Sequence, residues 1–308
     1  ACAFHAKELG MPALVIDFDD ILKRIRNYSK EKQILPDYGR GDKLYFPKGG
    51  SLTNSLVFEP IDKDDLCQKW KKLYFQHSVP AQSGVEFLGL QQQTDGIWQA
   101  KCFNHNLKEA CSYRAKHIVI AIGRGEPRTF DLPGNCDGIA YRLEDPATFV
   151  GQPALVIGGG TSAAEAVLAI SDHKHRHNDP TAVYWSYRGK KMPKVSKALS
   201  DRFFEAYVYN GNIRYFPESE ATAVVTAEDK NEYLAIRVDR KRIAGRPNET
   251  IQLEFPKTSC VACIGEDVPE KLLSQLGIFM RNGGSKKKKR MAVNRYMDEK
   301  NYQAEDLF

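Results

Sequence analysis

The 308-residue sequence has no apolar run long enough to cross a lipid bilayer. A membrane-spanning helix needs roughly 18 or more consecutive apolar residues, whereas the longest apolar stretches here, residues 118–122 and 154–157, have the length of strands. Hydrophobic residues make up 42% of the chain and charged residues 27%, which excludes a disordered chain. We therefore expect a soluble globular protein of about two domains, at ~150 residues each, that is not embedded in a membrane.

A strong charge of one sign is also missing. The chain has 45 Lys and Arg residues against 39 Asp and Glu residues, a net charge of +6. The single dense basic run, residues 286–290, is nearly as large as this whole excess. We therefore do not expect a nucleic acid as partner. The run follows Gly283 and Gly284 and is interpreted as an exposed loop, with contact to an acidic partner protein as the alternative.

Cysteines are few and odd in number, and no signal-peptide pattern stands at the start. Seven cysteines in a chain of this length predict reduced thiols, a cytoplasmic location and no disulfide framework. The one Cys-x-x-Cys spacing joins Cys260 to Cys263. Residues three apart on a strand point to opposite faces, which suits a disulfide poorly. A structural role is favoured, and redox and metal roles are the alternatives.

Hydrophobic periodicity predicts an α/β arrangement in the first 130 residues. Residues 1–10 predict a helix that ends at Gly10, and residues 13–17 predict a buried strand that ends in an acid, Asp17. Further expected elements are a helix at 63–75, a strand pair at 85–91 and 96–103, and a strand at 116–122 that runs into Gly123.

A complete strand, helix and strand unit follows residues 133–134. The expected elements are a strand at 154–157, a glycine turn at 158–161, a helix at 162–170 and a strand at 182–187. Beyond it we expect strands at 221–226, 233–239, 250–255 and 261–264 and a helix at 269–276. His173, His175 and His177 are expected in a solvated loop after the helix, with a metal site as the alternative.

The glycine turn carries the clearest chemical signal. Gly158-x-Gly160-x-x-Ala163 lies between a predicted strand and a predicted helix, the context in which this pattern binds a dinucleotide. Gly158 permits the tight turn, Gly160 lets amides approach a pyrophosphate, and Ala163 allows close packing of helix and strand. We expect Gly158, Gly160, Thr161, Ser162 and Ala163 to bind the nucleotide. A glycine-rich turn without a ligand is the alternative.

The end of the next strand indicates which dinucleotide binds. An NAD site has a carboxylate there for the ribose 2′-hydroxyl, and an NADP site has cations for the 2′-phosphate. This strand is followed by Arg188, Lys190 and Lys191 and by no acid. We predict NADPH, with Arg188 as the main phosphate ligand and the two lysines as helpers. Ordinary solvated cations are the alternative.

Six landmarks along the chain resemble a known family. They are IVIAIG at 118–123, Pro127-Arg128, LPG at 132–134, VIGGGTS at 156–162, CIG at 263–265 and LGI at 276–278. In this order they resemble the two-dinucleotide-domain flavoproteins of the thioredoxin reductase type, in the pyridine nucleotide-disulfide oxidoreductase superfamily. The resemblance implies an α/β fold of two Rossmann-like domains. An NADPH domain, residues 131–260, would be inserted into a split FAD domain, residues 1–130 and 261–308.

The resemblance also implies roles for residues of the FAD domain. Asp17 would hold the adenosine ribose of FAD, Val85 would place its strand backbone beside the adenine, and Ala121 to Gly123 would form the crossover between the domains. It implies NADPH and FAD as cofactors, hydride transfer from NADPH to flavin, and a homodimer as an open alternative to a monomer.

Two departures from the family pattern concern the binding of FAD. The family's first strand and glycine-rich loop are absent before the helix at 1–10, and the chain stops at residue 308 before the family's Gly-Asp pair. Either the chain is a piece of a larger protein, or it is a relative that has lost ordinary FAD contacts. Because the missing loop would supply hydrogen bonds to a charged phosphate, we expect weak or absent FAD binding.

A third departure concerns the redox dithiol of the thioredoxin reductases. Cys136 lies near the expected place, but Pro133 stands where its partner would be. We therefore predict an NADPH-dependent FAD oxidoreductase without a Cys-x-x-Cys, which passes electrons to a redox protein or a small molecule such as a quinone or oxygen. No catalytic acid or base is assigned. The alternatives are a flavin monooxygenase-like enzyme and a non-catalytic NADPH-binding sensor or partner module.

Overall fold

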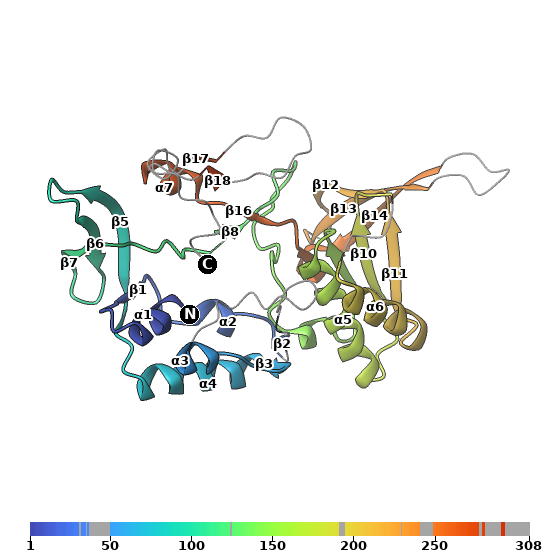
Figure 1. Cartoon of the computed structure of the whole chain (residues 1–308). Coiled ribbons are helices and arrows are strands. Elements are labelled where there is room, and N and C mark those ends of the chain that lie inside the picture. The colour runs from blue at the N-terminus through green and yellow to red at the C-terminus, as the bar shows by residue number, and fades with distance from the viewer. Residues whose placement is uncertain are drawn as a thin grey trace. The chain divides into compact units, whose positions relative to one another are not determined.

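The computed structural model of the chain describes residues 1–30, 32–34, 36, 50–123, 125–190, 195–228, 230–240, 249–276, 279–280 and 291–292. The chain forms two compact units. Unit 1 comprises Ala1–Asn27, Gln33–Gly123 and Val268–Phe308, and unit 2 comprises Tyr28–Lys32 and Arg124–Asp267. One long segment, residues 124–267, is thus inserted between two parts of unit 1 (Figure 1).

Unit 1 combines short helices with small sheets. Strand β1 (Val15–Asp17) pairs in parallel with β4 (Ala81–Ser83), and β5 (Val85–Gln92), β6 (Trp98–Asn104) and β7 (Glu109–Ala115) form an antiparallel sheet. The remaining elements are α1 (Cys2–Glu8), α2 (Lys23–Arg26), β2 (Gln33–Ile34), α3 (Ser51–Asn54), β3 (Ile61–Asp62), α4 (Lys63–Gln76), α7 (Glu270–Gln275), β17 (Phe279–Met280) and β18 (Met291–Ala292).

The helices at 1–10 and 63–75 are confirmed as α1 and α4. The carboxylate of Asp62 accepts a hydrogen bond of 2.8 Å from the amide of Asp64, which caps α4 at its start. Phe4 of α1 is completely buried and packs with Leu56 and Val79. The burial of such a side chain stabilises the fold by about 1.5–3 kcal/mol.

The strand predicted at residues 116–122 is wrong. The segment has no strand in the structure, and Val119 and Ile122 are 66% and 41% exposed. An apolar run becomes a strand only where a neighbour supplies hydrogen-bond partners for its backbone. Among the described residues, β1 pairs with β4 alone, so this sheet provides no such neighbour.

Unit 2 is built on a four-stranded parallel sheet. Its order is β11 (Ile213–Pro217), β10 (Val183–Tyr187), β9 (Ala154–Ile157) and β15 (Cys260–Ala262). Around it lie α5 (Thr161–Arg176), α6 (Lys197–Tyr209), the antiparallel strands β12 (Ser219–Thr226), β13 (Glu232–Arg240) and β14 (Glu249–Pro256), the short pair β8 (Glu126–Pro127) and β16 (Glu266–Asp267), and the 3-10 helices η1 (Pro146–Phe149) and η2 (Lys257–Ser259).

The alternating side chains of β9 divide unit 2 into three layers. Ala154 and Val156 pack into a core with α5 and α6, whereas Leu155 and Ile157 pack into a second core with β12, β13 and β14. The parallel sheet therefore lies between a helical layer and an antiparallel sheet (Figure 1). All four residues of β9 are buried, as expected for a parallel strand covered on both faces.

Each strand predicted for unit 2 coincides with a strand of the structure, but the predicted end of the helix after the glycine turn does not. Helix α5 continues to Arg176, so His173 and His175 lie in the helix and not in a loop. Basic residues suit this last turn because the helix dipole is negative there. The predicted NADPH domain, residues 131–260, lies within unit 2, and β15 at its end pairs with β9.

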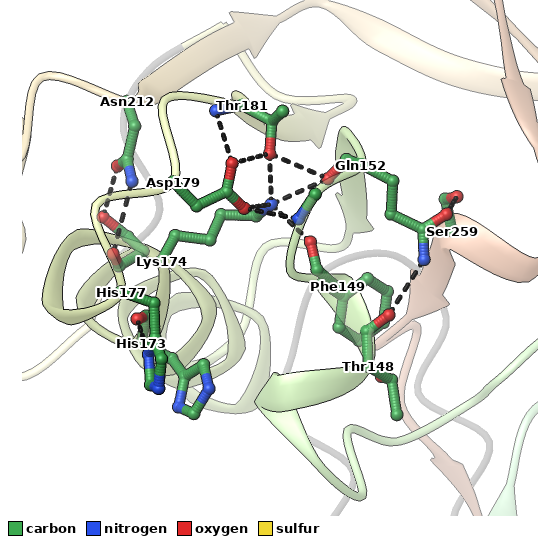
Figure 2. Close-up of polar contacts among 12 residues, drawn as sticks. Thr148, Phe149, Gln152, His173, Lys174, His177, Asp179, Thr181, Asn212 and Ser259 are labelled. Atoms are coloured by element: carbon green, nitrogen blue, oxygen red, sulfur yellow. Dashed lines mark hydrogen bonds and ion pairs between the residues drawn. The ribbon is translucent and has the colours of Figure 1, made fainter.

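A buried polar cluster holds together the end of α5 and the loops beside it (Figure 2). The Lys174 ammonium, fully buried, donates to the carbonyls of Phe149 and Gln152, the latter at 2.7 Å. It also lies 2.8 Å from the Asp179 carboxylate and 2.5 Å from the Thr181 hydroxyl. Because a 16-residue helix is about 24 Å long, this cluster lies far from the glycine turn at the start of α5.

Candidate functional site

The first glycine of the predicted motif lies in a turn that only glycine adopts readily. Gly158 follows β9 with a φ of +137°, in the range that side chains disfavour. A Cβ atom there would lie 2.1 Å from the carbonyl oxygen of Cys263 and 3.4 Å from the Cβ of Ala163. Ala163 is itself completely buried. The turn and the close packing therefore depend on the small size of both residues.

Gly160 stands at the N-cap of α5, where the helix start is open. No side chain caps the helix, and a Cβ atom at Gly160 would meet nothing within 4 Å. Within the described part of the chain, no acceptor bonds the amides of Gly160, Thr161 and Ser162. Such unpaired amides at the positive end of a long helix favour an anion, and a phosphate is the typical one.

Two exposed cations stand just beyond the end of the neighbouring strand β10. Arg188 and Lys190 form no ion pair with any residue that the structure describes. Both are therefore available to an anionic ligand. Lys191, the third predicted cation, lies outside the described residues, as does the basic run at 286–290.

The sequence reasoning missed three residues that shape this site. The ring of Tyr187, the last residue of β10, lies directly against Gly159 and Gly189. A Cβ atom would lie 1.9 Å from the Tyr187 Cε2 at Gly159 and 2.4 Å from its Cε1 at Gly189. The sequence held no local signal for this contact, because Gly159 lies 28 positions before Tyr187.

In unit 1, Asp17 ends β1 and is half-buried. Its Oδ1 accepts a hydrogen bond of 3.0 Å from the amide of Asp19. Asp19 and Asp20 form ion pairs with Lys23 and Arg26, at 2.5 and 2.6 Å, so Asp17 is the one acid of this loop without a cation among the described residues. Its carboxylate is available to accept hydrogen bonds, as a ribose ligand requires.

The other predicted residues of unit 1 lie on β5 and in the segment before unit 2. Val85, at the start of β5, is buried, whereas Ala121 and Gly123 are exposed. Gly123 has a φ of +72°, and a Cβ atom there would lie 2.9 Å from the Arg24 Nη1. The described residues of unit 1 contain no glycine-rich turn between a strand and a helix.

The cysteines of the Cys-x-x-Cys spacing belong to different cores. Cys260 is buried on the side of the antiparallel sheet, and Cys263 packs against the helical side. Both are free thiols, and burial raises the pKa of each to about 12. The opposite faces predicted from strand alternation are confirmed. Neither thiol has the low pKa of a redox-active cysteine.

Neither a metal site nor a membrane-spanning helix is found in the part of the chain that the structure describes. No three His, Cys, Asp or Glu side chains there are grouped so that they could hold a metal ion. The helices of that part are too short or too polar for any of them to span a bilayer.

The parallel sheet, the open helix start and the cations after β10 form the arrangement that is typical of dinucleotide-binding α/β proteins. Residues 1–296 match the family described as pyridine nucleotide-disulphide oxidoreductase. The chain belongs to this family, and the resemblance seen in the sequence is confirmed.

The relatives and solved structures similar to the chain carry related names. A ferredoxin–NADP reductase of Thermus thermophilus is 34% identical over 80 residues, 24% of this chain and 24% of that protein. One of Ignicoccus hospitalis is 21% identical over 170 residues, 54% of this chain and 47% of that protein. The matches thus span less than half of either curated relative.

The similar solved structures establish the fold. A bacillithiol disulfide reductase from Bacillus cereus has a TM-score of 0.67 at 18% identity and covers 91% of this chain and 78% of its own. A thioredoxin reductase of Lactococcus lactis has a TM-score of 0.63 at 18% identity and covers 94% and 82%. The predicted fold, a mixed α/β chain of two Rossmann-like domains with one inserted into the other, is confirmed.

Proposed function

We propose that unit 2 binds NADPH and that the protein is an NADPH-dependent FAD oxidoreductase without a redox dithiol. The observation that carries the proposal is the uncapped start of α5 behind Gly160, with the unpaired cations Arg188 and Lys190 after the adjacent strand. These groups match the two anionic parts of NADPH, its pyrophosphate and its 2′-phosphate.

Each residue has a role set by its chemistry. The amides of Gly160, Thr161 and Ser162 hold the pyrophosphate, because a helix start attracts anions. The planar guanidinium of Arg188 binds the 2′-phosphate through two parallel hydrogen bonds, and Lys190 adds a point charge. Asp17 accepts hydrogen bonds from the adenosine ribose of FAD. FAD, when bound, supplies the hydride-accepting ring system.

The electron acceptor is proposed as a class only. The buried Cys260 and Cys263, with pKa values of about 12, give no support to disulfide chemistry inside the chain. The curated relatives are named for ferredoxin, which supports a small redox protein as the acceptor. A small-molecule acceptor is the alternative.

The nucleotide part of the proposal is tested by substitution of Gly160. Gly160→Val places its side chain in open space, so the fold should tolerate it, while the side chain blocks the approach of a phosphate. The matched control is Gly89→Val, because a Cβ atom at Gly89 also meets nothing within 4 Å. We expect NADPH affinity, measured by calorimetry, to fall by about tenfold or more in Gly160→Val and to stay unchanged in the control. Unchanged affinity in Gly160→Val would contradict the proposal.

The flavin part is tested by the visible spectrum of the purified chain with added FAD, together with its intact mass. A flavin absorbance that NADPH bleaches supports the oxidoreductase. A protein that binds NADPH but reduces no flavin even with FAD in excess contradicts the flavin part and favours a non-catalytic nucleotide-binding module.

A further inference from the structure

The ring of Tyr187 fills the space between the glycine turn and the loop that carries the cations. Its Cε2 edge lies against Gly159 and its Cε1 edge against Gly189, where added Cβ atoms would approach the ring to 1.9 and 2.4 Å. Real Cβ contacts are not shorter than about 3 Å. No side chain fits at either position while the ring stays in place.

The backbone does not explain these two glycines. Neither Gly159 nor Gly189 has a positive φ, so any residue could adopt either conformation. The ring of Tyr187 is therefore the reason that the described structure gives for glycine at both positions. One aromatic ring links the phosphate-binding turn after β9 to the residue that follows Arg188.

Hydrogen bonds fix the backbone at both sides of Arg188. The amide of Tyr187 donates to the Ser219 hydroxyl at 3.2 Å, and the carbonyl of Gly189 accepts from the amide of Glu218 at 3.1 Å. The Ser219 oxygen also lies 2.8 Å from that of Ser186. The residues directly before and after Arg188 are thus both held by hydrogen bonds.

The Tyr187 ring acts through its shape and not through its hydroxyl. The hydroxyl forms no hydrogen bond with a described residue. Its neighbour Tyr215 has a buried hydroxyl that also lacks a described partner, and burial, with a smaller effect of Tyr187, raises the pKa of Tyr215 to about 12.

We propose that Tyr187 is a positioning residue that selects nucleotides with a 2′-phosphate. The ring acts as a spacer between Gly159 and Gly189, and so sets the place of the Arg188 guanidinium relative to the pyrophosphate-binding turn. This inference rests on the proposed function, because it takes unit 2 as the NADPH site. A ligand with two phosphate groups at a fixed separation benefits from binding groups held at that separation.

The spacer is tested through the ratio of NADPH affinity to NADH affinity. In Tyr187→Ala the ring that separates Gly159 from Gly189 is absent. NADPH affinity should therefore fall about tenfold or more, while NADH affinity changes by less than about threefold. Tyr187→Phe keeps the ring and should keep the wild-type ratio. Calorimetric titration measures both affinities, and thermal unfolding confirms that each variant is folded.

Gly189→Ala tests the same contact from the other side. Its methyl group would approach Cε1 of Tyr187 to 2.4 Å and displace the ring, so the affinity ratio should fall as in Tyr187→Ala. The double variant with Tyr187→Ala and Gly189→Ala has no ring for the methyl group to displace. Its affinity ratio should therefore equal that of Tyr187→Ala alone, which is a non-additive result. Gly89→Ala, in open space, is the control. If Tyr187→Ala does not fold, Gly189→Ala decides the matter.

The outcomes separate this inference from the proposed function. A wild-type protein that binds neither NADPH nor NADH overturns both. A wild-type preference for NADPH that persists in Tyr187→Ala and Gly189→Ala overturns the spacer and leaves the NADPH site standing. An equal loss of both affinities in these variants indicates a merely structural ring and also overturns the spacer.

Discussion

The ammonium of Lys174 lies 2.8 Å from the carboxylate of Asp179, and the two side chains are 0% and 5% exposed. Burial by itself raises the pKa of Asp179, but hydrogen bonds from Lys174, Thr181 and Gly151 outweigh it and hold this pKa below its usual range. The pair joins the last turn of α5 to the loop before β10 (Figure 2). It stands at the end of the helix away from the glycine turn.

Removal of the lysine should therefore destabilise unit 2. Lys174→Met leaves a buried carboxylate without its cation, which costs about 3–5 kcal/mol. Urea denaturation measures the loss in free energy of unfolding. The control is Arg114→Met, whose ion pair with Asp95 is exposed, so a loss of less than about 1 kcal/mol is expected. Similar losses of unfolding free energy in the two variants would show that the buried Lys174–Asp179 pair contributes no more to stability than an exposed ion pair.

The carboxylate of Glu8 predicts a pH dependence of stability in unit 1. It accepts hydrogen bonds from the Thr53 hydroxyl at 2.7 Å and from the Thr53 and Gly50 amides at 2.8 and 3.2 Å. The bonds from Thr53 are the main cause that lowers the pKa of Glu8 to about 2. The folded state therefore binds its proton less readily than the unfolded chain, in which a glutamate has a pKa of about 4.3.

This difference stabilises the fold at neutral pH and is lost as the pH falls from about 4.3 to about 2. Glu8→Gln removes the titrating group. We expect the variant to be less stable than the wild type at pH 6 and the two to converge towards pH 2, as measured by urea denaturation across this range. A gap that stays constant with pH would contradict the role of the Glu8 charge.

The charge of Arg188 should matter for one nucleotide and not for the other. Arg188→Ala removes the proposed partner of the 2′-phosphate, so NADPH affinity should fall much more than NADH affinity, by about tenfold or more. Lys190→Ala, which removes a single point charge, should have a smaller effect on the same ratio. Equal losses for NADPH and NADH in Arg188→Ala would refute the assignment of this residue.

The sequence predicted best what depends on a short stretch of chain. The buried strand at 154–157 and the glycine turn after it are local patterns, and the structure has both. Helix α6 was missed because its second half, FFEAYVY, is rich in aromatic residues that favour strands. The strand expected at 116–122 failed for a similar reason, since a local preference for strand cannot supply a neighbouring strand.

The contact of Tyr187 with two glycines could not be predicted for a related reason. Gly159 lies 28 positions from Tyr187 in the sequence, so only the pairing of β9 with β10 brings the two together. The motif pattern counts Gly158 and Gly160 and treats the residue between them as variable. Here that residue is the one that the ring constrains.

The thiols of Cys260 and Cys263 should be inert in the folded protein. With pKa values of about 12, only about one thiol in ten thousand is ionised at pH 8. Cys2 is exposed and serves as the internal control. We expect iodoacetamide to label Cys2 rapidly and the other two only after denaturation, as followed by mass spectrometry. Rapid labelling of Cys263 under native conditions would reopen the redox alternative.

Gly158 and Gly160 should respond to alanine in different ways, although they belong to the same motif. A methyl group on Gly158 would lie 2.1 Å from the carbonyl oxygen of Cys263, on a backbone with a φ of +137°. Gly158→Ala must therefore shift the end of β9 or the segment after β15, at a cost of about 1–3 kcal/mol or more. Gly160→Ala meets no atom within 4 Å and should leave the free energy of unfolding nearly unchanged. Urea denaturation of both variants without nucleotide separates a glycine that the fold requires from one that a ligand requires. If both variants are destabilised equally, Gly160 also serves the fold, and the open space above it no longer indicates a bound phosphate.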